Sequence, residues 1–534
     1  MIAAILVLVA AVFLSVPLTT KFGRAAGWPL AAIYLVAVGF LWSTITEVHH
    51  GGAPAWGRPW ISTFDVDLAL RADGLSIIFA LIAIVIGAIV FAYSARYLSS
   101  EGPHRSFYFV MALFTTSMLV LVLADNLFLL FICWELTSMA SFILIARSGR
   151  PGQAASMRTL LVTFVGGLAL LAAIGLIVAQ TGTQSLHEAL ADPAWRELNG
   201  FTGTVAALVA IAGFTKAAQF PFHIWLPDAM TAPTPVSAYL HAAAVVKAGI
   251  FLLLRFSPAF HDNLVWNVLL VSMGLVTALI GARLALQQSD LKRLMAYSTV
   301  SQLGLIVATI GVGTPFAIAA ATLHTIAHAL FKSGLFMMVG VVDHVAHTRD
   351  MRRLPPLWRH MPFAFVVTIL GCAAMAGIPP LLGFVSKEAV FTSLLHVGHP
   401  VLGWIAVTAA AVASVMTTRG ARRRPRTRTS PALRALARSD PRTADHHGRL
   451  RRRWPAGVAA REALEAPRAP GAAQGRAARR RAPGHPGHPA AVAARRPSGG
   501  RVQPGRLSLP PHRGHLLLHG GRDPRHEPLG RGEG

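Results

Sequence analysis

Ionisable side chains interrupt the long apolar stretches of this chain. They are four lysines, two glutamates and four histidines: Lys216, Lys247, Lys332, Lys387, Glu135, Glu388, His223, His241, His324 and His328. A charge at the centre of a bilayer costs roughly 2.5–3.5 kcal/mol on insertion scales, so such residues usually have a function. One of them can be part of a structural ion pair, but the whole set would need a partner for every member. We predict that they form a pathway for protons or cations.

The basic residues inside these stretches are all lysines, and this choice has a chemical meaning. Arginine stays protonated in proteins, whereas a desolvated lysine loses its proton readily. A nearby carboxylate favours the charged form again. A lysine beside a titratable carboxylate can therefore bind and release a proton, and Glu135 and Lys216 are candidates for such a pair.

Three of these residues follow one another at helical spacing. His324, His328 and Lys332 are separated by four positions each, which places them along one face of a helix. Histidine titrates near neutral pH, so this face is typical of a proton relay. The alternative is that the three are polar contacts between helices. Lys387 and Glu388 are sequence neighbours and point in different directions on a helix, so they offer two sites or a local counter-charge.

Glycine and proline interrupt two of the stretches close to a lysine. We expect helix breaks at Pro221, after Lys216, and at Gly377, Pro379 and Pro380, before Lys387. Proline removes a backbone donor and breaks a helix. Broken spans with a nearby charge in two halves of a chain are typical of transporters built from inverted repeats. The layout predicts two inverted five-helix repeats.

The elements that must position these residues are transmembrane helices. Of 534 residues, 54% are hydrophobic and only 13% are charged, against about a quarter in a soluble domain. The recurring apolar runs predict an all-α polytopic membrane protein with about thirteen transmembrane helices. The predicted spans are 1–17, 27–44, 74–95, 107–123, 126–146, 159–181, 202–224, 233–254, 264–282, 297–312, 314–340, 362–394 and 400–417. The first run lacks the basic start and cleavage site of a signal peptide, so we expect it to be retained.

The spans divide the chain into four predicted parts. N-terminal helices occupy 1–106, the first repeat 107–256, the second and truncated repeat 264–417, and a tail 418–534. Of the 22 Lys and Arg in residues 1–418, fourteen lie in odd-numbered loops and four in even-numbered loops. The positive-inside rule then predicts a multi-pass protein of the cell membrane, inner or plasma, with its N-terminus outside.

The tail differs sharply in composition from the rest of the chain. Residues 419–534 contain 27 Arg, no Lys and seven Asp plus Glu, a net charge of +20 out of +26. A basic disordered tail would bind anionic lipid or nucleic acid. The absence of Lys, Ile, Phe, Tyr, Asn and Met from these residues instead indicates that GC-rich DNA is read out of frame from about codon 418. Either origin predicts an unstructured segment.

No motif indicates a cofactor. The two cysteines, Cys133 and Cys372, form no metal motif, and we find neither a phosphate-binding loop nor a dinucleotide fingerprint. We expect no ATP, dinucleotide, haem or iron–sulfur site and no metal site. Transport energy would then come from an ion gradient or from a partner.

Several long motifs occur in one order along the chain. They are "FICWELTS" around Glu135, "FTKAAQFPFHIWLPDAM" around Lys216, "APTPVSAYLHAA" through His241, "SDLKRLMAYSTVSQLGLI", "HTIAHALFKSGLFM" and "AGIPPLLGFVSKEAVF". Together they resemble the antiporter-like family, which includes Mrp-type multisubunit Na+/H+ antiporters and the proton-pumping membrane subunits of respiratory complex I. The segments "VVKAG", "GVVDHVAHTRDMRRL" and "RADGLSIIFALI" resemble the A-type large subunit of Mrp antiporters more than the L-type subunit of complex I.

The resemblance implies roles for individual residues. Glu135 would partner Lys216, and Lys247 with His241 would pass protons centrally. His324, His328 and Lys332 match a broken central span, and Lys387 with Glu388 matches an exit-side site. The implied partners are other membrane subunits, lipids, H+ and Na+, with no nucleic acid. Such an antiporter subunit is a secondary transporter and no enzyme.

The alternatives to an antiporter subunit differ in their partners. A proton-pumping subunit of NADH-quinone oxidoreductase would need redox partners. A membrane-anchored binder of nucleic acid or lipid would act through the tail, which leaves the buried lysines unexplained.

Overall fold

Long helices make up most of the structure. The computed structural model describes residues 1–414 except 65, 198, 355–356, 396–402, 405 and 413. It divides the chain into two units, Met1–Ser439 and Asp440–Gly534, and every described residue belongs to the first. The predicted tail and its proposed change of reading frame lie outside the described residues, and the predicted span 400–417 lies partly outside them.

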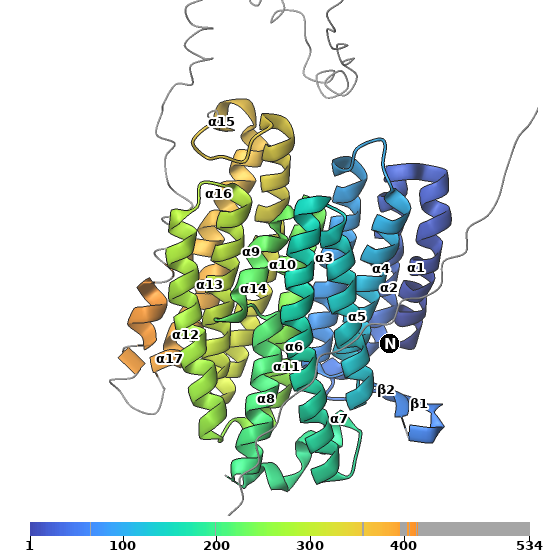
Figure 1. The fold of residues 1–534 in the computed structure, drawn as a ribbon, viewed down its shortest axis with the longest axis vertical. Helices are drawn as coiled ribbons and strands as arrows, with labels where there is room; N and C mark the ends of the chain where they lie inside the picture. Colours follow the sequence, from blue (N-terminus) through green and yellow to red (C-terminus); the bar gives the residue numbers. More distant parts are fainter. Residues whose placement is uncertain are drawn as a thin grey trace, which may run out of the picture. The chain divides into compact units, whose positions relative to one another are not determined.

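The described helices of the N-terminal half pack side by side (Figure 1). They are α1 (Ile2–Phe22), α2 (Gly27–His49), α3 (Gly74–Tyr97), α4 (His104–Leu123), α5 (Leu127–Ala146), α6 (Arg150–Thr181), the short α7 (Leu186–Ala191) and α8 (Gly200–Lys216). Several begin at a side chain that caps the free N–H groups of the first turn. Asn126 accepts from the N–H groups of Phe128 and Leu129, and Asn199 accepts from that of Thr202, as expected of N-cap residues.

The remaining helices continue the bundle. They are α9 (Trp225–Asp228), α10 (Thr234–Ala242), α11 (Val245–Phe260), α12 (Leu264–Gln287), α13 (Leu291–Ile310), α14 (Pro315–Ala346), α15 (Leu357–His360), α16 (Pro362–Ala376) and α17 (Leu382–Leu395). Among the described residues, nine helical segments are long and apolar enough to cross a membrane, with α1 and α2 counted as one segment and α10 and α11 as another. Two shorter apolar helices, α8 and α16, follow the same pattern. These helices confirm the prediction of a mostly helical membrane protein.

One small sheet departs from the predicted all-α fold. Strands β1 (Ala55–Ile61) and β2 (Val66–Arg71) pair antiparallel, with Ala55 opposite Arg71. Most of β1 is exposed, so its sequence shows no burial alternation from which a strand could be predicted. The hairpin follows α2 and leads directly into α3.

Three helix breaks lie near the predicted site residues. α8 ends at Lys216, before Pro221, and α16 ends at Ala376, where Gly377 adopts a positive φ of 79° that favours glycine. The predicted single span 233–254 is instead two helices, α10 and α11, that meet at Ala243 and Ala244. These two residues are as apolar as their neighbours, so no residue type signals that break.

The prediction that His324, His328 and Lys332 lie on a broken span is wrong. α14 runs without interruption from Pro315 to Ala346. Its only proline stands at the first helical position, where the missing N–H does no harm.

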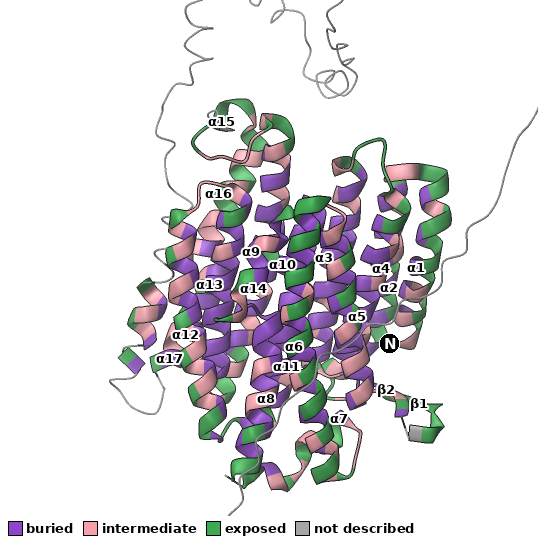
Figure 2. Cartoon of the chain, viewed as in Figure 1, coloured by how far each residue is buried: buried purple, intermediate pink, exposed green. Residues whose placement is uncertain are grey.

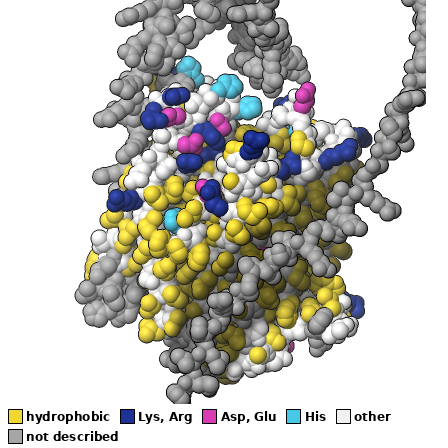
Figure 3. Space-filling model, viewed as in Figure 1, with side chains coloured by type: hydrophobic (Ala, Val, Ile, Leu, Met, Phe, Trp, Pro, Cys, Tyr) yellow, Lys and Arg dark blue, Asp and Glu magenta, His cyan; other side chains and the backbone are white. Residues whose placement is uncertain are grey.

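The outer faces of the bundle are apolar. Figure 2 shows buried residues concentrated along the inner faces of the helices and exposed ones on the outside. Large apolar side chains are nevertheless exposed, among them Phe13, Trp42, Leu264 and Phe363. In Figure 3 hydrophobic side chains cover the middle of the visible face, while most charged side chains gather near one end. Exposed apolar surface of this extent indicates contact with lipid or partner subunits.

Candidate functional site

The first cluster forms where α8 ends against α5. Lys216 is completely buried, and its Nζ donates to the carbonyl of Trp134 and to Thr137 Oγ1, both at 2.5 Å. The ammonium also lies 4.0 Å from the centroid of the Trp134 ring, a cation–π contact. Three neutral groups of α5 therefore hold this lysine.

Glu135 lies on the same turn of α5 but does not bind Lys216. Among the described residues no ion pair joins the two side chains. The carboxylate lies against Gly167 of α6, where a Cβ would overlap Oε1. Oε1 is buried and has no hydrogen-bond partner. The two predicted partners thus share one site without direct contact.

A second cluster joins α11 to α14. Lys247 is completely buried and its Nζ lies 3.0 Å from Nδ1 of His328, also completely buried. Nε2 of His328 has no partner. An amine and an imidazole at hydrogen-bond distance can share a proton, because each is a base that the other can protonate.

His324, one turn before His328, links α14 to two further helices. Its Nδ1 lies 3.0 Å from Ser386 Oγ of α17, and its Nε2 lies 3.1 Å from Gln302 Oε1 of α13. Sequence reasoning does not single out Ser386 or Gln302, because serine and glutamine are common as polar contacts between helices.

Lys332 and His241 lie on neighbouring helices, since α10 packs against α14. Lys332 Nζ donates to Ser298 Oγ at 2.5 Å and to the carbonyl of Met295 at 3.3 Å. His241 packs against Phe336, with ring centroids 4.7 Å apart, and both of its ring nitrogens lack a hydrogen-bond partner. Both residues are completely buried.

Lys387 and Glu388 separate in the structure. Lys387 is buried on α17, and its Nζ has no hydrogen-bond partner. Its side chain packs close to Gly377 at the helix break. Glu388 is exposed in the single chain, so the structure does not bring it together with Lys387.

Lys292 is predicted to lie in a loop, but the structure buries it. It lies in the first turn of α13, and its Nζ donates to the carbonyl of Ala232 at 2.6 Å. Asp290 beside it caps α13 and pairs with Arg349 at 3.4 Å. Because Lys292 lies among other charged residues, the sequence does not indicate that its side chain points inward.

The buried lysines share one property. Within the part of the chain that the structure describes, no lysine takes part in an ion pair. Carbonyls, hydroxyls and an imidazole take the place of carboxylates. Buried polar atoms without a partner are rare in native proteins, yet Glu135, His241, His328 and Lys387 each keep at least one. These atoms remain available to accept or donate a proton.

The described residues contain no group of three or more His, Cys, Asp or Glu that could hold a metal ion. The ionisable groups that line the two clusters are amines, imidazoles and one half-buried carboxylate.

This bundle with its buried basic residues matches known proteins. Residues 124–417 match the family model described as NADH:quinone oxidoreductase/Mrp antiporter, transmembrane, and residues 59–109 match the N-terminus of complex I chain 5. The chain belongs to the NADH:quinone oxidoreductase/Mrp antiporter family.

Its relatives within that family include Mrp proteins. The A-type subunit of a Na+/H+ antiporter from Alkalihalophilus pseudofirmus is 40% identical over 427 residues, which cover 75% of this chain and 53% of that protein. A chain of the Mrp complex from Dietzia sp. DQ12-45-1b is 51% identical with a TM-score of 0.76, over 79% of this chain and 46% of that one. The predicted resemblance to the A-type large subunit of Mrp antiporters is confirmed.

A more distant solved structure is an archaeal respiratory membrane complex. The membrane-bound sulfane sulfur reductase contains a chain that is 26% identical with a TM-score of 0.68, over 77% of this chain and 69% of that one. The present chain spans about half the length of the curated relatives it matches.

Proposed function

We propose that this chain is a proton-translocating subunit of a multisubunit monovalent cation (Na+)/proton antiporter. The observation that carries the proposal is the row of buried lysines, of which Lys216, Lys247 and Lys332 are completely buried and held by neutral groups. An ammonium ion that leaves water without a counter-ion pays a large desolvation cost. Such a lysine releases its proton when a neighbouring base can take it, so the row suits proton transfer better than static pairing.

We infer the following order for the path. Glu135 and Lys216 form the first site, Lys247 with His241 and His328 the central one, and His324 and Lys332 extend it along α14. Lys387 forms the last site, and Glu388 on the exposed face of α17 faces lipid or another protein of the assembly. The charge at Glu135 acts on Lys216 through space, because no ion pair holds the two together.

The proposal includes the finer architecture. It assumes thirteen spans, with 1–106 as N-terminal helices and two inverted repeats over 107–256 and 264–417, in the cell membrane with the N-terminus outside. The breaks at Pro221 and at Gly377, Pro379 and Pro380, each beside a lysine, support the repeats. Other membrane subunits would complete the assembly.

Replacement of Lys216 by alanine tests the proposal. In the assembly reconstituted from its native membrane, Lys216→Ala should abolish Na+-driven proton movement while the protein stays in the membrane. Lys21→Ala, at an exposed lysine of α1, is the matched control and should exchange like wild type. Wild-type exchange in Lys216→Ala would contradict the assignment.

The alternative is a proton-pumping subunit of an NADH-quinone oxidoreductase, and it predicts different companions. Affinity purification followed by mass spectrometry distinguishes the two. Small hydrophobic subunits support the antiporter, whereas flavin and iron–sulfur subunits support the oxidoreductase. The same spectra show whether Arg-rich peptides or new hydrophobic sequence follow Met416.

A further inference from the structure

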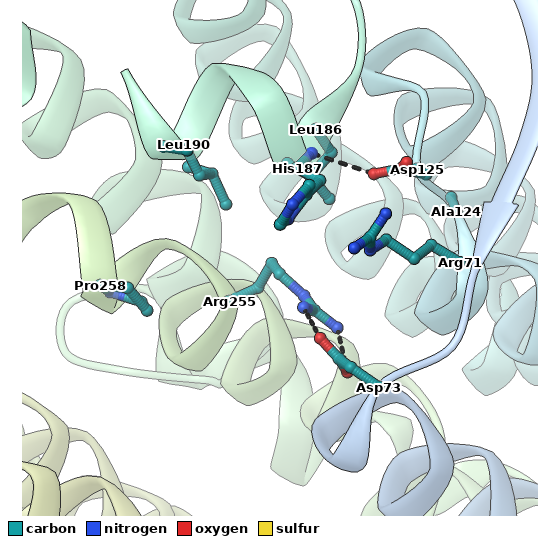
Figure 4. Close-up of a pocket in the computed structure, with 10 residues that line it drawn as sticks. Arg71, Asp73, Ala124, Asp125, Leu186, His187, Leu190, Arg255 and Pro258 are labelled. Carbon is teal, nitrogen blue, oxygen red and sulfur yellow. Dashed lines mark hydrogen bonds and ion pairs between the residues drawn. The ribbon is translucent and has the colours of Figure 1, made fainter. Parts of the chain in front are cut away.

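A polar cavity lies at the end of the bundle that carries the β1–β2 hairpin. It measures about 240 Å³ and is lined by ionisable side chains from four places in the sequence: Arg71, Asp73, Asp125, His187 and Arg255. Figure 4 shows Arg71, His187 and Arg255 pointing into this space, with the dashed contacts of the two aspartates at its edge. None of these residues belongs to the row of buried lysines.

An ion pair forms one wall of the cavity. Arg255 of α11 donates through Nη2 to Asp73 Oδ1 at 3.0 Å and to Ser76 Oγ at 2.8 Å, and through Nη1 to Asp73 Oδ2. Burial raises the pKa of Asp73, but the hydrogen bonds and charge of Arg255 outweigh it and lower that pKa to about 2. Asp73 therefore stays ionised and the pair stays charged.

The same pair also borders a second cavity. This space, of about 560 Å³, shares Asp73, Arg255 and Pro258 with the first and follows α14 from Ile318 to Ile326. The ion pair thus stands between the hairpin-side cavity and a second space that lies along α14.

α11 connects the pair to the central cluster along one face. Lys247, Phe251 and Arg255 are spaced i, i+4 and i+8, so about 12 Å along the helix separates the first from the last. The Arg255 guanidinium lies 5.2 Å from the Phe251 ring, and Phe251 packs edge-on against Phe79 of α3 at 5.3 Å. Both phenylalanines are at most 1% exposed. A buried aromatic contact therefore lies between Arg255 and Lys247 along this face of α11.

We propose that the hairpin-side cavity is a proton port, that Asp73 and Arg255 form its gate, and that it leads past Phe79 and Phe251 to Lys247 and His328. The inference rests on the proposed function, because it gives the central cluster a route to one surface. Asp125 is the acceptor at the mouth. Burial raises the pKa of its carboxyl, although the N–H of His187 and the charge of Arg71 oppose the rise.

In this state the port is closed. A paired guanidinium repels an excess proton, and Phe251, which lies one turn from both Arg255 and Lys247 on α11, is buried against Phe79. Transport then requires a rearrangement in which the rings part. Removal of a ring should leave a permanent leak.

Proton flux without antiport tests the port. The whole assembly is placed in Na+-free liposomes that contain a trapped pH dye, and a K+ diffusion potential drives protons. Phe251→Ala should raise proton flux severalfold over wild type. Phe256→Ala, at an equally buried ring of α11 that packs on Phe260 instead, is the matched control and should not. Phe251→Leu should give a smaller leak if the alanine variant fails to assemble.

A second substitution tests where the leak leads. Lys247→Met in the Phe251→Ala background should abolish the extra flux. Leaks of equal size in Phe251→Ala and Phe256→Ala, or a leak that persists without Lys247, would overturn the port. Because no Na+ is present, this result is independent of the exchange measured for Lys216→Ala, so either proposal can fail alone.

Discussion

The helix breaks beside Lys216 and Lys387 both combine a lysine with a nearby glutamate, but the two lysines differ in position and surroundings. Lys216 is the last residue of α8, before its break, whereas Lys387 lies in α17, after its break. Lys216 donates to two oxygens of α5 and faces an indole ring, but Lys387 has no hydrogen-bond partner. Glu135 is half-buried near the first lysine, and Glu388 is exposed near the second.

A shared layout of lysine and helix break therefore does not give two equal sites. The first lysine is stabilised by neutral dipoles, so its charged form is tolerated there. At the second lysine no hydrogen bond within the described residues offsets the cost of removing the ammonium group from water. The two sites therefore accommodate a buried ammonium group in different ways.

Lys387→Met should produce the largest effect. We expect proton exchange to fall by roughly a hundredfold or more, equivalent to about 2.7 kcal/mol, while thermal stability rises because an unpartnered buried charge disappears at similar volume. Lys216→Met should lose exchange without that gain, because it also loses two hydrogen bonds. Exchange assays and thermal melts of the purified assembly check both, and equal melting shifts would show that the two sites are alike.

Glu135→Gln should come next. The amide keeps the shape of the side chain but removes the charge that acts on Lys216, so we expect exchange to fall by roughly tenfold. Assays at one fixed pH gradient measure it. Unchanged exchange would mean that Glu135 has no electrostatic part in the first site.

Gly167→Ala should have an intermediate effect on the same site. A Cβ at Gly167 would overlap Glu135 Oε1 and displace the carboxylate, so exchange should fall by roughly threefold. Gly175→Ala on the same helix has open space around its Cβ and is the matched control. If both variants lose exchange equally, the position of the carboxylate is not what matters.

Glu388→Gln should have the smallest effect on exchange. The carboxylate is exposed and separate from Lys387, so we expect a change within about twofold. Blue-native electrophoresis of the same variant tests whether the assembly weakens instead. A loss of exchange as large as that of Glu135→Gln would return Glu388 to the path and remove the contrast between the two sites.

The buried groups are predictable from the sequence where a single residue type carries the signal. Lys216, Lys247, Lys332 and Lys387 stand out because ammonium groups in apolar runs are rare, and the structure buries all four. Lys292 escapes this reasoning because its neighbours Asp290 and Arg293 make the segment resemble a solvated loop.

Backbone features with no side-chain signature are harder to predict. The break between α10 and α11 falls at two alanines, and strand β1 shows no burial alternation. The partners of His324 could not be predicted from the sequence either, because Gln302 and Ser386 contact His324 only when α13, α14 and α17 pack together. Tertiary packing, rather than local preference, decides these features.

Lys216→Arg distinguishes proton transfer at Lys216 from a fixed positive charge there. Arginine keeps a positive charge at the end of α8 but does not release its proton. If the buried lysines carry protons, Lys216→Arg should be as inactive as Lys216→Ala when Na+-driven proton movement is measured in liposomes that contain the whole assembly. If Lys216→Arg exchanges like wild type, the lysine supplies only a fixed charge, and proton transfer through these residues is contradicted.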